Sequence, residues 1–220
     1  ALAPHFDVSS FATVIIPLNP GEYEGGLFVQ EGADASSRLL VDSSFEKGDA
    51  LVHRFDVMHG VEVSAGDRYS LVLWLSDSPE SVAAKAAPWL RGAAESGNAY
   101  AQFLYAEFLK TGSYGFEKDI GRAVEYQARA ARQGHALSQH MLGMMYLAGI
   151  DVEQSDERCR ELWFAAAEAG LASAQVSVAV SFQNGRLGLE RDVHEARRWY
   201  ERAARQGHAE AALVLRTWGW

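Results

Sequence analysis

A five-residue pattern of small side chains recurs along the last two thirds of the chain at nearly constant spacing. The pattern is Ala-Ala-x-x-Gly, and its glycines are separated by 37, 36 and 37 residues. They are Gly97, Gly134, Gly170 and Gly207. A second series, at a spacing of 37 and 36 residues, consists of Gly112, Gly149 and Gly185. A period of this size is typical of stacked helical hairpins.

Each part of the pattern has a physical role in such a hairpin. A glycine just past a helix end supplies the positive φ that the C′ position needs. Paired alanines let neighbouring helices approach closely, and a large side chain eight residues before each terminal glycine fills the groove between them. These large residues are Trp89, Tyr126, Leu162 and Trp199. We therefore expect an all-α helical-hairpin solenoid over residues 79–220, in which each hairpin buries its face against the next.

This pattern resembles the Sel1-like repeats, which are relatives of the tetratricopeptide repeat. The resemblance covers residues 79–220, with three full repeats and a partial one at each end. It implies binding of a protein partner on the repeats. His135 and His208 recur at one repeat position, which indicates an architectural role.

Residues 1–78 show no helical periodicity and contain about six short β-segments separated by turn residues. Short, closely spaced strands of this kind favour a jelly-roll or double-stranded β-helix. The sequence thus predicts an α+β protein of two domains. Residues 1–78 would form the jelly-roll, incomplete at its N-terminal side, and residues 79–220 the solenoid.

Candidate metal ligands occur in this first part. His5 and Asp7 form a His-x-Asp motif, and His59 begins a later strand. Two histidines and one carboxylate can cap one face of an octahedral ion, as in non-haem Fe(II) oxygenases. Arg68 and Ser70 share one face of the following strand, where a guanidinium needs an anionic partner such as a carboxylate.

These residues, in this order, resemble the iron(II)/2-oxoglutarate-dependent dioxygenases, most closely the prolyl and lysyl hydroxylases, over roughly residues 4–78. The resemblance implies that His5, Asp7 and His59 hold Fe(II) and that Arg68 and Ser70 bind the far carboxylate of 2-oxoglutarate. It implies no catalytic residue beyond the metal ligands. It makes ascorbate a candidate reductant and a protein or peptide side chain the substrate.

One departure from that family leaves a second hypothesis open. The strands and helices that the family places before its His-x-Asp motif are missing from this sequence. The alternative is a non-catalytic adaptor with a degenerate barrel and a protein-binding repeat array. His53 shares a strand face with Leu51 and Phe55, which favours a structural role for it over a ligand role.

The charge distribution limits the choice of partners. The net charge is −9, of which −8 falls on residues 1–78. An acidic surface disfavours nucleic acid, which proteins bind mainly through Lys and Arg. No apolar run has the length of a membrane span. Cys159 is the only cysteine, so no internal disulfide is expected and a reducing, cytoplasmic compartment is slightly favoured.

Overall fold

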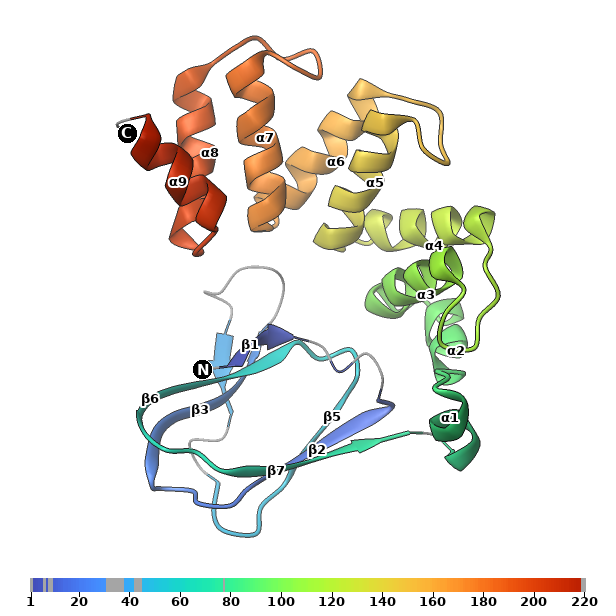
Figure 1. Ribbon diagram of the computed structural model, residues 1–220, viewed down its shortest axis with the longest axis vertical. Coiled ribbons are helices and arrows are strands. Elements are labelled where there is room, and N and C mark those ends of the chain that lie inside the picture. The colour runs from blue at the N-terminus through green and yellow to red at the C-terminus, as the bar shows by residue number, and fades with distance from the viewer. Residues whose placement is uncertain are drawn as a thin grey trace.

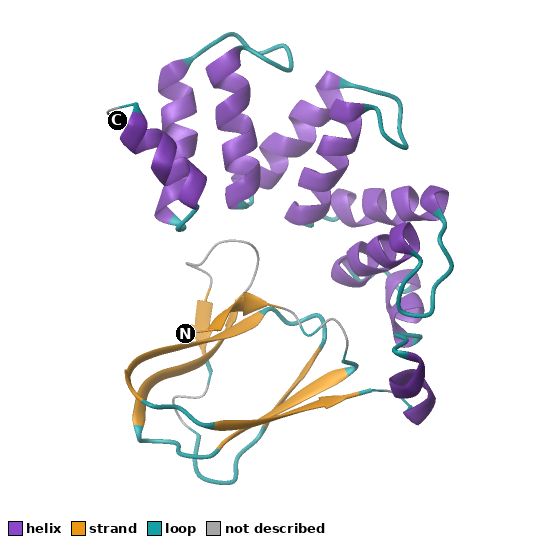
Figure 2. Ribbon diagram, viewed as in Figure 1, coloured by secondary structure: helices purple, strands orange, loops and turns teal. Residues whose placement is uncertain are grey.

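The computed structural model describes residues 2–5, 7, 10–30, 38–41, 45–76 and 78–218. The side chains of residues 2–5, 82 and 83 lie outside this description. Strands come first along the chain and helices follow. In Figure 1 the helices form an arc that passes over the strand region. Figure 2 shows that the two kinds of element do not mix.

The strands form two antiparallel sheets. The four-stranded sheet has the order β1 (Leu2–His5), β6 (His59–Gly66), β3 (Tyr23–Gln30) and β4 (Arg38–Leu40). The three-stranded sheet has the order β5 (Leu51–Arg54), β2 (Ala12–Pro17) and β7 (Ser70–Leu75). The inner face of β2 carries Thr13 and Ile15, both buried. Alternation along β2 therefore divides residues between core and solvent.

The predicted jelly-roll is confirmed only as a small antiparallel sheet region. Among the described strands the two sheets stay separate, and no closed barrel forms. Apolar residues on both faces of the strand after Arg68 predict a strand that is buried between two layers, and this prediction is wrong. This strand, β7, lies at the edge of its sheet, and Leu71, Leu73 and Trp74 are exposed. The apolar residues on both faces of β7 made it resemble a central strand.

The helices occupy residues 79–217 and pair as the glycine spacing predicts. They are α1 (Pro79–Ala84), α2 (Trp89–Glu95), α3 (Ala99–Thr111), α4 (Ile120–Arg132), α5 (Ala136–Ala148), α6 (Asp156–Glu168), α7 (Ala172–Asn184), α8 (Val193–Arg205) and α9 (Ala209–Thr217). Gly112, Gly149 and Gly185 end α3, α5 and α7 in the left-handed conformation. This conformation is favourable for glycine. None of the described helices combines the length and apolar character needed to cross a bilayer.

Glutamines connect successive hairpins. The Gln102 amide donates to the carbonyl of Ala94, and Gln133 donates to Gln102 at 2.7 Å. The same pair of bonds recurs two repeats later. There Gln175 donates to the carbonyl of Ala167, and Gln206 donates to Gln175. In the middle repeat an alanine, Ala169, stands where the others have Gln133 and Gln206. That substitution explains why Oε1 of Gln139 has no hydrogen-bond partner among the described residues.

The strand region meets the array at its first complete repeat. Phe55 follows β5 and is buried in one core with Leu90, Tyr100 and Leu104 of α2 and α3. Asn98 caps α3 through its side-chain oxygen and donates its amide hydrogen to Asp56 at 2.7 Å. A helix cap therefore also fixes the position of the sheets.

The cap of α5 is a histidine whose burial shifts its ionisation. His135 caps α5 by accepting from Ser138, and its ring packs 5.0 Å from that of Phe103. Burial lowers the pKa of His135 to about 4. The unfolded chain takes up a proton near pH 6.5 and the folded chain only near pH 4, so stability falls as the pH drops through this window.

We predict that His135→Asn removes this part of the acid sensitivity. Asparagine is the residue that caps α3 in the preceding repeat, at Asn98, so the cap is retained. Between pH 7 and pH 4 the variant should lose on the order of 3 kcal/mol less stability than the wild type, from 1.36 kcal/mol per pKa unit. Urea denaturation followed by circular dichroism at several pH values measures the difference. Parallel losses in the two proteins would contradict the assignment.

Candidate functional site

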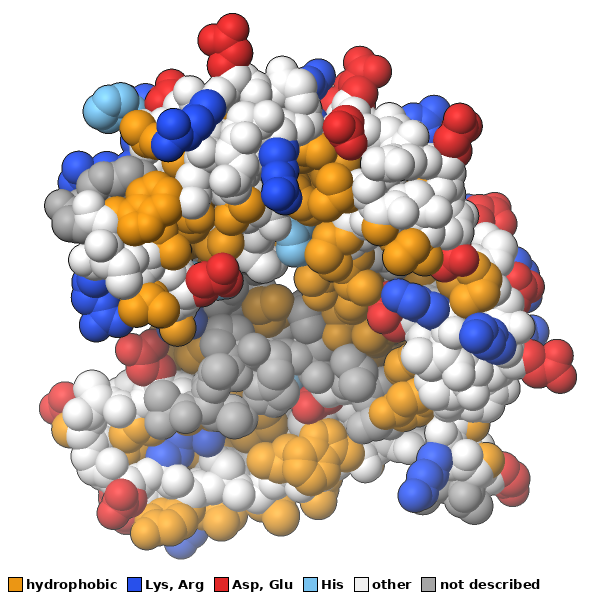
Figure 3. All heavy atoms as spheres, turned by 45° about the horizontal axis from the view of Figure 1, so that its top comes forward, with side chains coloured by type: hydrophobic (Ala, Val, Ile, Leu, Met, Phe, Trp, Pro, Cys, Tyr) orange, Lys and Arg blue, Asp and Glu red, His pale blue; other side chains and the backbone are white. Residues whose placement is uncertain are grey.

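A pocket of about 280 Å³ opens between α3, α4 and α5, the first repeat and the start of the second. Its walls are mostly apolar and include three methionines. They comprise Ala106, Ile120, Ala123, Val124, Met141, Met144, Met145, Ala148 and Ile150. Figure 3 shows hydrophobic side chains exposed over the middle of the helical array. Long apolar side chains that can re-pack are typical of adaptable binding surfaces.

The pocket exists because one repeat position is occupied differently in the first repeat. The equivalent residues of α4, α6 and α8 are Gln127, Trp163 and Tyr200. Trp163 and Tyr200 are buried and fill their grooves. Gln127 is shorter, and it lines the pocket instead of filling it.

Gln127 also leaves a polar group without a partner. It is only 3% exposed, and neither atom of its amide has a hydrogen-bond partner among the described residues. An unsatisfied buried amide is unfavourable by about 1–3 kcal/mol. Glu107, Lys110 and Asp151 add charges of both signs to the lining. The pocket is therefore suited to an apolar group that carries a donor and an acceptor.

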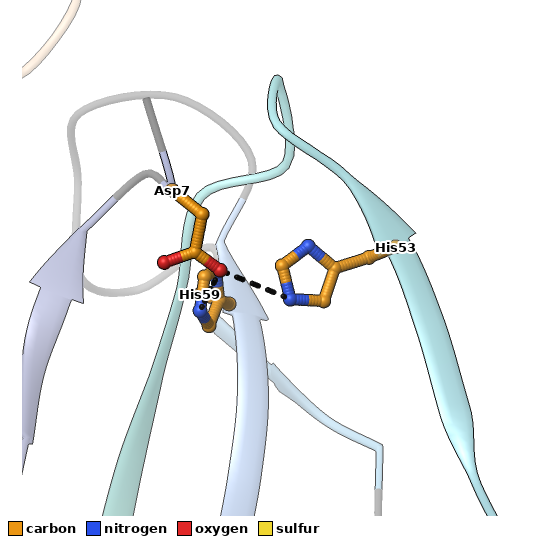
Figure 4. A group of neighbouring side chains, drawn as sticks. All are labelled: Asp7, His53 and His59. Atoms are coloured by element: carbon orange, nitrogen blue, oxygen red, sulfur yellow. Dashed lines mark ion pairs between the residues drawn. The ribbon is translucent and has the colours of Figure 1, made fainter. Parts of the chain in front are cut away.

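A second candidate site lies between the two sheets. The predicted ligands Asp7 and His59 come together there, with Oδ2 of Asp7 3.5 Å from Nε2 of His59. The third group is His53 on β5, whose Nε2 lies 3.7 Å from the same oxygen. Figure 4 shows the Asp7 carboxylate beside both imidazoles, whose ring centroids lie 4.1 Å apart. His5 pairs with His59 through the backbone of β1 and β6, and its side chain lies outside the described residues.

The residues predicted to bind 2-oxoglutarate lie near β7. Arg68 is half-buried, and its Nε donates to the hydroxyl of Tyr23 at 3.3 Å. Its guanidinium carbon lies 5.6 Å from the centroid of the Tyr23 ring. Ser70 pairs with Pro17 in the sheet, and its hydroxyl has no hydrogen-bond partner among the described residues. No comparison tests the predicted Fe(II), 2-oxoglutarate or ascorbate, and these stay predictions.

The cluster between the sheets is electrostatically linked to the array. Burial, and then the negative charges of Asp7 and Asp56, raise the pKa of Tyr100 on α3 above its ordinary value. The tyrosine ring also lies 6.5 Å from that of Phe55. Tyr100 therefore stays protonated, and the charge of Asp7 adds to the effect of burial on its ionisation.

Stacked helical hairpins with a 36- to 37-residue period define a helical-repeat protein of the tetratricopeptide-related class. The family model described as "Sel1 repeat" matches residues 99–135, 136–171 and 172–208. These matches together cover half of the 220 residues. The chain belongs to the Sel1-repeat family.

Curated relatives share the repeats. Chitin synthase regulatory factor 3 of Schizosaccharomyces pombe is 32% identical over 115 residues, which are 52% of this chain and 12% of that protein. The chitin synthase regulator SKT5 of Malassezia restricta is 34% identical over 131 residues, 58% of this chain and 9% of the relative. The regulator of the same name from Saccharomyces cerevisiae is 29% identical over 57% of this chain and 18% of its own length. The chain thus spans less than a fifth of these relatives.

Two solved structures have the same repeat architecture. A Sel1 repeat protein from Oxalobacter formigenes is 32% identical, with a TM-score of 0.56 over 59% of this chain and 96% of that one. A protective antigen of uropathogenic Escherichia coli strains is 30% identical, with a TM-score of 0.54 over 63% of this chain and 28% of that one.

These findings correct the functional prediction. The matched family model is the Sel1 repeat, the three relatives are regulators of chitin synthase, and none of these is an iron(II)/2-oxoglutarate-dependent dioxygenase. The predicted hydroxylase activity is therefore contradicted, and the alternative of a non-catalytic adaptor is better supported. Two histidines and a carboxylate can bind a metal ion. The same ligand types also hold ions with purely structural roles, so they do not by themselves indicate catalysis.

Sequence reasoning missed two residues that the structure brings into the sites. His53 was expected to be structural, although it lies six residues before His59 and alternation places it on the inner face of its strand. Gln127 gave a clearer signal, because aligning the repeats places it in a column with Trp163 and Tyr200. A shorter, polar residue in a column of aromatic residues indicates a cavity.

Proposed function

We propose that this chain is a non-catalytic adaptor whose first repeat holds a partner protein through one inserted side chain. The single observation that carries the proposal is the pocket created at Gln127, where the later repeats carry aromatic residues. Burying one leucine, methionine or phenylalanine side chain there contributes about 1.5–3 kcal/mol to binding.

The polar groups of the pocket narrow the choice of ligand. A peptide unit has one donor and one acceptor, which match the two unpartnered atoms of the Gln127 amide. The amide atoms are shielded in the unbound chain, so a peptide segment whose backbone follows its apolar side chain toward the pocket satisfies both when the Gln127 side chain turns toward it. This argues for a protein segment as the occupant, since a purely apolar molecule would leave the amide unsatisfied.

The names of the relatives indicate what kind of partner to test first. All three are regulators or regulatory factors of chitin synthase. We infer that this chain also acts on a partner enzyme by binding it, and that a chitin synthase is the first candidate. Because the shared segment is a small part of each relative, the proposal concerns binding by the repeats.

Replacement of Gln127 by tyrosine tests the pocket directly. The third repeat carries this residue, Tyr200, opposite Ala179, and the first repeat has the equivalent Ala106. The variant should therefore fold and fill its own pocket. Peptides selected from a displayed library on the wild-type chain should bind Gln127→Tyr roughly 10- to 100-fold more weakly.

The matched control introduces the same residue on the same helix outside the pocket. Glu125 is exposed on α4, where it pairs with Arg129, and Glu125→Tyr should leave peptide affinity within about twofold because exposed pairs contribute little. Selected peptides that bind all three proteins equally would show that the partner surface lies elsewhere.

A further inference from the structure

Three side chains from distant parts of the chain place their ligating atoms together in the strand region. Asp7 follows β1, His53 comes from β5 of one sheet, and His59 begins β6 of the other. The ligating atoms all lie within 4.8 Å of one another. The side chains of Asp7, His53 and His59 are 8%, 5% and 4% exposed. Figure 4 shows both imidazoles directed at the carboxylate.

The hydrogen bonds of the two imidazoles determine what their other nitrogens can do. Nδ1 of His53 lies 3.0 Å from the carbonyl oxygen of Arg54, and Nδ1 of His59 lies 3.1 Å from that of Val57. A carbonyl oxygen only accepts, so each Nδ1 carries a hydrogen. In the neutral rings Nε2 therefore presents a lone pair toward Asp7. Outer contacts of this kind orient the histidines of metal sites.

Three lone-pair atoms that face one another form a suitable site for a cation. Nε2 of His53 has no hydrogen-bond partner among the described residues, and it lies 3.7 Å from Oδ2 of Asp7. The separations of 3.5 and 3.7 Å are too long for a good hydrogen bond. They are close to the separation of about 3.4 Å that two ligand atoms have when bonds of about 2.1 Å meet at a tetrahedral ion.

The carboxylate is held in place by its own contacts. The hydroxyl of Thr13 donates to Oδ2 of Asp7, and both the backbone and the hydroxyl of Ser10 donate to the Asp7 carbonyl. Thr13 and Ser10 are themselves buried. The site is therefore built from both sheets and from the segment that joins β1 to β2.

We propose that Asp7, His53 and His59 bind one divalent first-row transition ion, for which Zn²⁺ is the probe. Imidazole nitrogens favour Zn²⁺, Cu²⁺, Fe²⁺ and Ni²⁺ over Mg²⁺ and Ca²⁺. This set contains His53, which the resemblance did not include. The ion joins the two sheets beside Tyr100 and the cap of α3, so it fixes the strand region next to the first repeat.

The test compares His53→Gln with His5→Gln. The 220-residue chain is freed of metal with a chelator and titrated with Zn²⁺ by calorimetry, and Co²⁺ spectra report the ligands. Wild type should bind one Zn²⁺ per chain, and His53→Gln should bind at least about tenfold more weakly. His5→Gln should bind within about threefold of wild type. Circular dichroism establishes that each variant is folded, and Asp7→Asn replaces His53→Gln if that variant does not fold.

Several outcomes would overturn the proposal. If the wild-type chain does not bind one Zn²⁺ per chain, a proton or an ion pair satisfies the cluster and the proposal is wrong. If the folded His53→Gln variant binds Zn²⁺ with wild-type affinity, His53 is not a ligand, regardless of the Zn²⁺ affinity of His5→Gln. Mg²⁺ that competes with Zn²⁺ at equal concentration would contradict an imidazole site.

Discussion

Replacing Trp163 by alanine should lower the free energy of unfolding by about 3–5 kcal/mol, the range found for large aromatic residues in cores. Trp163 is 8% exposed and belongs to the core that joins the second and third repeats. Its Nε1 also donates to the carbonyl of His140 at 3.1 Å. In a repeat array a lost interface weakens the coupling of both neighbours. Urea denaturation followed by circular dichroism measures the loss.

The contact partner of Trp163 offers a sharper version of the same test. A Cβ on Gly143 would lie 2.5 Å from Cδ1 of Trp163, so Gly143→Ala should destabilise the wild type by about 1–3 kcal/mol. In the Trp163→Ala background the same change should stabilise by up to about 1 kcal/mol, because alanine has the higher helix propensity. Equal effects in the two backgrounds would contradict this contact. Trp218→Ala, at a residue 41% exposed, is the control and should change stability by less than about 1 kcal/mol.

The second large effect is expected in the strand region, at Gly25. This glycine has φ +93° beside an irregularity in the pairing of β3 with β6. An added Cβ would lie 2.2 Å from the backbone oxygen of Glu62, which cannot move without opening the ladder. Gly25→Ala should therefore destabilise the sheet by about 2–5 kcal/mol, combining left-handed strain with overpacking.

Gly48 separates these two contributions. It has φ +106° but nothing within 4 Å of an added Cβ. Gly48→Ala should reveal the conformational part alone, about 1–2 kcal/mol. Hydrogen exchange of the β3 and β6 amides should accelerate in Gly25→Ala and stay unchanged in Gly48→Ala. If both variants behave alike, steric contact with Glu62 is not what constrains Gly25.

The repeats could be predicted from the sequence because their information is local and repeated. Gly112, Gly149 and Gly185 each mark a helix end by conformation, and the structure places each in the left-handed region. The pocket was not predicted, although its cause is visible at Gln127. A cavity forms where a side chain is too short to fill the groove between three helices. The recurring glycines and alanines that define the repeat do not report the size of that side chain.

The strand region was harder to predict because strand pairing is non-local. The alternation around Leu71 and Leu73 could not show that β7 lies at a sheet edge. His53 and His59 belong to different sheets, so their approach depends on how the sheets face each other. The functional error had another cause. A donor set of Asp7 and His59 carries the same chemistry whether the ion it holds is structural or catalytic.

The methionine methyl groups provide the most direct measurement of the adaptor account. Met141, Met144 and Met145 line the pocket, and the fourth methionine, Met58, lies in the strand region. With methyl-labelled methionine, a selected peptide should shift the three pocket signals in the wild type, leave Met58 unchanged, and shift none in Gln127→Tyr. A peptide that binds the wild type tightly while all three pocket methyl signals stay in place would contradict the account.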